Sequence, residues 1–200
     1  MRDRPKVAGA GATLWQHDPA GGPPRLLASC VIAIPASDNA QLAEVSGCRA
    51  GLSLLAHTRP GVMGARIVGD HLAAVRYGAG TGRYRRLPLA TQMDLALRPL
   101  LESGWSLTWQ AVRRRLNKAG DRLATLGVFW ADALRASGDN AVHTWTVWHD
   151  VPAAANHQPP PLFPGDGCER LDPQVVDATA TALEAEAARW LRQARAAGRA

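Results

Sequence analysis

Two apolar runs separated by a turn-rich connection place the strongest constraint on what this chain can fold into. The first run extends from Gly9 to Trp15 and the second from Arg25 to Pro35. Between them, residues 19–24 contain three prolines and two glycines, which reverse the chain more readily than they continue a strand. Two strand-like runs joined in this way predict an antiparallel meander at the start of the fold.

Helix and strand patterns alternate after this meander. Cap-type residues at 37–39 precede a segment whose apolar residues recur at helical spacing. The expected helices cover residues 40–57, 71–77, 89–103 and 117–136, and the expected strands cover residues 65–70 and 105–112. We expect Pro99 to kink or shorten the third of these helices. The order predicts an α/β fold with a mixed sheet whose antiparallel strands come first.

The charge is distributed unevenly along the chain. Residues 1–138 contain 18 Lys and Arg against 9 Asp and Glu, whereas residues 139–200 contain 5 against 8. A basic segment with few acids is typical of domains that bind polyanions, although many arginine-rich proteins are simply soluble. The sequence has no apolar run of membrane-spanning length and no signal-peptide core, so we expect an intracellular protein without membrane contact.

The composition changes after residue 138. We therefore expect one domain at residues 1–138, followed by a proline-rich linker at 139–171 that carries one more strand over 141–148. Residues 172–200 predict an amphipathic helix with an apolar seam. Such a helix either docks on its own domain or binds a partner helix.

Three acidic residues lie at positions in this pattern that suggest a shared function. Glu44 lies inside the first expected helix, Asp70 at the end of a strand, and Asp121 in the first turn of the last helix. Each acid alone is most simply a surface residue. Together they offer the oxygen ligands that Mg²⁺ and Mn²⁺ prefer, and two such ions about 4 Å apart can activate water against a phosphodiester.

These residues resemble the type-1 ribonuclease H family, in particular its retroelement and plant-like version. Residues 43–52, with Ala-Glu, Gly and Ala-Gly-Leu, resemble the first helix of that family. Residues 68–70 resemble its Gly-Asp-Ser strand end, with His71 in place of the serine. Residues 112–124 match the closing pattern Val-x-Arg-x-x-Asn-x-x-Ala-Asp-x-Leu-Ala, with Gly120 where alanine is usual.

The resemblance covers about residues 7–136 and implies both a fold and an activity. The fold is a mixed five-stranded ribonuclease H-like sheet flanked by helices. The activity is endonucleolytic hydrolysis of the RNA strand of RNA–DNA hybrids by a two-metal mechanism, with Mg²⁺ or Mn²⁺ as cofactor. The residues that would bind these metals and act in catalysis are Glu44, Asp70 and Asp121.

Substrate contacts also follow from the resemblance. Asn39 and Gln41, the amides before Glu44, would contact the minor groove of the hybrid, where 2′-hydroxyls are exposed. Arg114 and Asn117 are further substrate-binding candidates. The arginines at 83, 85, 86 and 113–115 are either phosphate contacts or a solvated basic face.

One departure concerns the first strand of the family, which carries an Asp-Gly pair whose Asp bridges both metals. Asp3 is only six residues before Gly9, too few for a strand, the Asp and a turn. We therefore expect that strand to be missing, which leaves an open edge between its neighbours in the sheet. The alternative function is a catalytically impaired nucleic-acid-binding module or a retroelement remnant. We also expect a monomer, in a reverse-transcriptase context.

Overall fold

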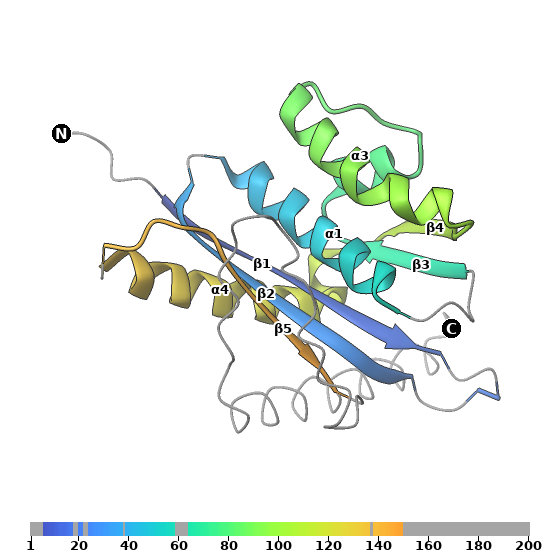
Figure 1. The fold of residues 1–200 in the computed structure, drawn as a ribbon, viewed down its shortest axis with the longest axis horizontal. Helices are drawn as coiled ribbons and strands as arrows, with labels where there is room; N and C mark the ends of the chain where they lie inside the picture. Colours follow the sequence, from blue (N-terminus) through green and yellow to red (C-terminus); the bar gives the residue numbers. More distant parts are fainter. Residues whose placement is uncertain are drawn as a thin grey trace.

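The computed structural model describes residues 6–17, 20–21, 24–37, 39–58, 64–136 and 138–149. Strands and helices are interspersed along these residues (Figure 1). The strands are β1 (Lys6–Gln16), β2 (Arg25–Ser37), β3 (Gly64–Gly69), β4 (Ser106–Ala111) and β5 (His143–Trp148). The helices are α1 (Ala40–Ala56), α2 (Leu72–Gly78), α3 (Leu87–Glu102) and α4 (Lys118–Ala136), with a 3₁₀ turn η1 (Arg114–Leu116) before α4. This order confirms the predicted α/β class.

The strands of the described segments form two separate ladders. β1, β2 and β5 form an antiparallel sheet in the order β1-β2-β5, in which Ile32 lies opposite Ala10 on one side and Thr144 on the other. β3 and β4 pair in parallel. No ladder joins β1 to β3 within these segments, so each of the two strands has one edge open. The absence of a strand between the antiparallel and parallel parts stays a prediction.

Strand β2 is the centre of the antiparallel sheet and is buried on both faces. On one face Ile32 packs with Leu54 of α1, and on the other Val31 packs with Leu123 of α4. Helices α1 and α4 accordingly lie on opposite sides of this sheet (Figure 1). A strand covered on both faces carries apolar residues at successive positions instead of alternating with polar ones, which explains the long apolar run in the sequence.

A further core lies between α1, α3 and the β3–β4 pair. Leu52 of α1 and Met93 of α3 are fully buried at its centre. Trp105, just before β4, and Trp109 within it pack against the same cluster. Both tryptophans therefore contribute to the core.

Pro99 lies in the last turn of α3 and does not shorten the helix, which continues to Glu102. The backbone N–H and the hydroxyl of Ser103 both donate to the Pro99 carbonyl, at 3.1 and 2.7 Å. The proline removes one backbone N–H from the helix, and the two Ser103 donors satisfy the carbonyl of Pro99 at the helix end.

The strand expected over residues 141–148 is confirmed as β5, and it extends the antiparallel sheet at the edge of β2. The helix expected over 172–200 and the rest of the linker lie outside the described residues. The division into 1–138, 139–171 and 172–200 stays a prediction. Among the helices that the structure describes, none is long and apolar enough to cross a membrane.

Glycines allow the backbone of α4 to lie directly against the antiparallel sheet. A Cβ atom at Gly9 of β1 would overlap the carbonyl oxygen of Ala124 in α4. A Cβ atom at Gly127 of α4 would overlap the carbonyl oxygen of Ile32 in β2. Because both obstacles are backbone atoms, neither could rotate away, and the whole helix would have to move.

Replacing Gly9 with alanine is therefore expected to lower the free energy of unfolding by about 2 kcal/mol or more, as overpacking does in a filled core. The matched control is Gly64→Ala at the start of β3, where an added Cβ meets no atom within 4 Å. Urea denaturation of both variants measures the difference. Equal stability of the two variants would show that α4 does not approach β1 as closely as the structure indicates.

Candidate functional site

The three acids singled out in the sequence come together at one end of β3. Glu44 lies in the second turn of α1, Asp70 directly follows β3, and Asp121 lies in the first turn of α4. The negative charges of Asp70 and Asp121 both act on Glu44. Three separate elements thus bring their carboxyl groups into one electrostatic environment.

The pKa of Glu44 is raised above its ordinary value, and burial of the carboxyl group is the main cause. The charges of Asp70 and Asp121 raise it further, whereas His71 and Arg114 act in the opposite direction. The residue as a whole is still exposed to solvent, so the raised pKa reflects atoms packed around its carboxyl group. The site therefore disfavours a third negative charge in the absence of a cation.

Asn117 connects the end of β3 to the beginning of α4. Its side-chain amide donates to Oδ1 of Asp70 at 2.7 Å, and its backbone carbonyl accepts from the N–H of Asp121 at 3.0 Å. Nearby, the Val112 N–H donates to the Gly69 carbonyl at 2.9 Å. Asn117 was predicted to bind substrate, but in this structure its amide is engaged with Asp70.

Arg114 neutralises Asp121. Its Nε and Nη2 atoms both lie 2.6 Å from the same oxygen, Oδ1, of Asp121. This hydrogen bond and the charge of Asp121 raise the pKa of Arg114, with smaller contributions from Asp70 and Glu44. The Arg114 side chain is 73% exposed, and exposed ion pairs typically contribute only about 0–1 kcal/mol. A competing anion or cation could therefore separate the pair.

The carboxylates have the right chemistry for Mg²⁺ or Mn²⁺, but their arrangement does not fit a metal ion. Within the segments that the structure describes, no group of three or more His, Cys, Asp or Glu side chains is placed to hold one. The side-chain amide of Asn117 already donates a hydrogen bond to the Asp70 carboxylate, and the Arg114 guanidinium is already paired with the Asp121 carboxylate. The three carboxylates lie near one another but do not form a set of ligands for a metal ion.

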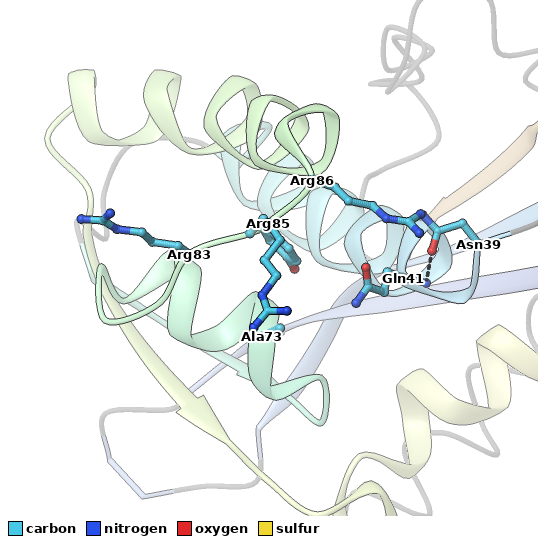
Figure 2. Close-up of a pocket in the computed structure, with 7 residues that line it drawn as sticks. Asn39, Gln41, Ala73, Arg83, Arg85 and Arg86 are labelled. Carbon is cyan, nitrogen blue, oxygen red and sulfur yellow. Dashed lines mark hydrogen bonds between the residues drawn. The ribbon is translucent and has the colours of Figure 1, made fainter.

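A pocket of about 430 Å³ lies beside the N-terminus of α1 (Figure 2). It is lined by residues from α1, α2 and the segment before α3, namely Asn39, Gln41, Ala73, Arg83, Tyr84, Arg85 and Arg86. The two amides predicted to bind substrate thus lie together with three arginines. Asn39 also caps α1, because its Oδ1 accepts from the Gln41 N–H at 3.0 Å. In Figure 2 the Arg86 side chain extends toward Asn39.

Two residues at the site were not assigned a role from the sequence. Nδ1 of His71 and the hydroxyl of Tyr84 are buried and have no hydrogen-bond partner in the structure. His71 was noted only because it replaces a serine of the family pattern. Tyr84 sits among arginines without any pattern of its own, so nothing in the sequence could indicate that its hydroxyl would be buried at a pocket.

No protein-family model matches this sequence, and no curated protein matches it. The structure is similar to that of the N-terminal RNase H domain of a Mycobacterium tuberculosis protein, solved as a fusion with maltose-binding protein, with a TM-score of 0.45, 22% identity, and coverage of 66% of this chain and 99% of that chain. It is also similar to RNase H1 from the halophilic archaeon Halobacterium salinarum NRC-1, with a TM-score of 0.40, 17% identity, and coverage of 60% and 96%. Likeness at this level assigns no residue a role.

The raised pKa of Glu44 predicts a pH-dependent effect of the substitution Glu44→Gln. The folded protein binds the Glu44 proton more tightly than the unfolded chain, so this group stabilises the fold at acid pH and the benefit is lost as the pH rises through the folded pKa. The variant should therefore gain stability relative to the wild type at about pH 7 compared with about pH 4. Urea denaturation at both pH values checks this, and a larger relative gain at the acid pH would contradict it.

Proposed function

We propose that this chain is a ribonuclease H-like protein that binds RNA–DNA hybrids and hydrolyses their RNA strand. The observation that carries the proposal is the convergence of Glu44, Asp70 and Asp121 at the end of β3, beside a pocket lined by arginines. Carboxylates supply ligands for a divalent metal, and arginines bind phosphate oxygens in a bidentate manner. Both features belong to proteins that act on a polyanionic backbone.

Substrate binding in this proposal involves the two amides and the basic side chains. Asn39 and Gln41 can exchange hydrogen bonds with 2′-hydroxyls, which distinguish RNA from DNA. The arginines at the pocket contact phosphates without reading the base sequence. Arg114, which is exposed, would leave Asp121 for a phosphate of the substrate. Asn117 would hold Asp70 in position.

The second candidate function is a nucleic-acid-binding module without catalytic activity. The observation that favours it is the engagement of two acids by Arg114 and Asn117, with no metal-holding group among the residues described. Two-metal hydrolysis requires a further carboxylate that bridges the ions. The open edges of β1 and β3 leave a place in the sheet for a strand that could supply one.

Other parts of the proposal rest on the resemblance to the family. We propose Mg²⁺ or Mn²⁺ as the metal once the ligand set is complete. We also propose that the protein acts as a monomer inside the cell, in a reverse-transcriptase context.

The decisive measurement is cleavage of a labelled RNA–DNA hybrid with Mg²⁺ or Mn²⁺. The 200-residue chain should bind the hybrid and cleave it slowly or not at all, because no further carboxylate joins the three acids to hold a metal among the described residues. Adding an N-terminal segment with an apolar strand that ends in Asp-Gly should produce metal-dependent cleavage. The substitution Asp70→Asn should then remove cleavage and leave hybrid binding unchanged.

The outcomes separate the two candidates. Binding without cleavage, even after the strand has been added, would favour the non-catalytic module. Rapid cleavage by the chain alone, abolished by Asp70→Asn, would show that another group already replaces the bridging carboxylate. Absence of hybrid binding at low salt would contradict both candidates, since phosphate contacts are strongest there.

A further inference from the structure

The pocket beside α1 has an unusual excess of positive charge. Arg83, Arg85 and Arg86 all line it, and none of its lining residues is acidic. No ion pair joins these three arginines to a carboxylate in the part of the chain that the structure describes. Arginines without acidic partners around a pocket remain available for an anionic ligand.

Two helices add to this charge. Asn39 is the N-cap of α1, which has 17 residues, and Arg86 is the N-cap of α3, which has 16 residues. Both caps line the pocket, and neither helix has an acidic residue in its first turn. Each helix N-terminus acts as roughly half a positive charge. The Arg83 side chain extends away from Asn39 and Gln41 (Figure 2). Together with the guanidinium groups of Arg85 and Arg86, the two helix N-termini give the pocket a charge of about +3.

Neutral donors complete the lining. The amides of Asn39 and Gln41 lie at the same pocket. Such donors can bind anion oxygens that face away from the arginines.

The amount of charge points to a particular class of anion. One phosphodiester of a nucleic-acid backbone carries a single negative charge, which would leave most of the positive charge uncompensated. Two or three linked phosphates bring several negative charges into one short anion. The volume of about 430 Å³ lies in the range of pockets that bind small molecules.

We propose that this pocket binds the oligophosphate group of a small molecule, such as tripolyphosphate or a nucleoside triphosphate. Arg85 and Arg86 hold the phosphate oxygens, and the side-chain amides of Asn39 and Gln41 donate further hydrogen bonds. This binding does not depend on hybrid hydrolysis. Asn39 and Gln41 are also candidates for hybrid binding. A bound oligophosphate would therefore exclude a hybrid from the same residues and so regulate hybrid binding.

The test is isothermal titration of the full chain with tripolyphosphate and with ATP, at one low salt concentration and with a chelator to remove metal ions. The double variant Arg85→Gln, Arg86→Gln should weaken binding by about tenfold for each arginine lost. The matched control is Arg66→Gln, Arg98→Gln, which removes the same charge from exposed positions outside the pocket. Circular dichroism should show that both double variants are folded.

Each outcome decides the proposal. Selective loss in the pocket variant supports it, and similar affinities for tripolyphosphate and ATP then identify the phosphate chain as the bound group. Tighter binding of ATP also supports it and adds a contact to the nucleoside. Equal loss in both double variants, or no binding by the wild type, would overturn the proposal. Tighter binding of a short oligonucleotide, with the same arginine dependence, would identify a backbone site instead. None of these results depends on whether the chain cleaves hybrids.

Discussion

The close contact between α4 and the antiparallel sheet is the constraint on which the rest of the structure depends. Gly9 and Gly127 let backbone meet backbone, so the depth of α4 against β1 and β2 is fixed by atoms that cannot rotate. That depth determines where the first turn of α4 lies. Asn117 then connects this turn to Asp70 at the end of β3. The position of Asp121 in the site therefore depends on the packing of its own helix against β1 and β2, strands from the start of the chain.

The gathered carboxylates need positive charge or protons, because like charges in one environment repel one another. Arg114 pairs with Asp121, Asn117 donates to Asp70, and the raised pKa of Glu44 makes it easier to protonate than an ordinary glutamate. These interactions stabilise the acids without a metal. The pair of Arg114 with Asp121 is exposed and therefore weak, so a stronger cation can displace Arg114.

The sequence predicted the order of elements well because the signals are local. The apolar run of β2 and the cap residue Asn39 each depend only on their neighbours in the chain. The acids were found because their positions relative to strand and helix ends matched a pattern. The partners of Arg114 and Asn117 could not be predicted, since long side chains choose among groups that only the fold brings near. The burial of the Tyr84 hydroxyl is likewise a property of packing between α1 and the segment before α3.

Helix α1 connects a basic site at its N-terminus with an acidic site in its second turn. Its N-cap, Asn39, lies at the arginine-lined pocket, and Glu44 lies five residues further on, among the carboxylates. At a rise of about 1.5 Å per residue, the two positions are about 7.5 Å apart along the helix. An anion is favoured at the first position and a cation at the second. A phosphate-bearing ligand that reaches from the pocket toward Glu44 therefore meets repulsion unless a cation accompanies it. The helix thereby fixes both the direction in which such a ligand can lie and the place where its counter-ion is needed.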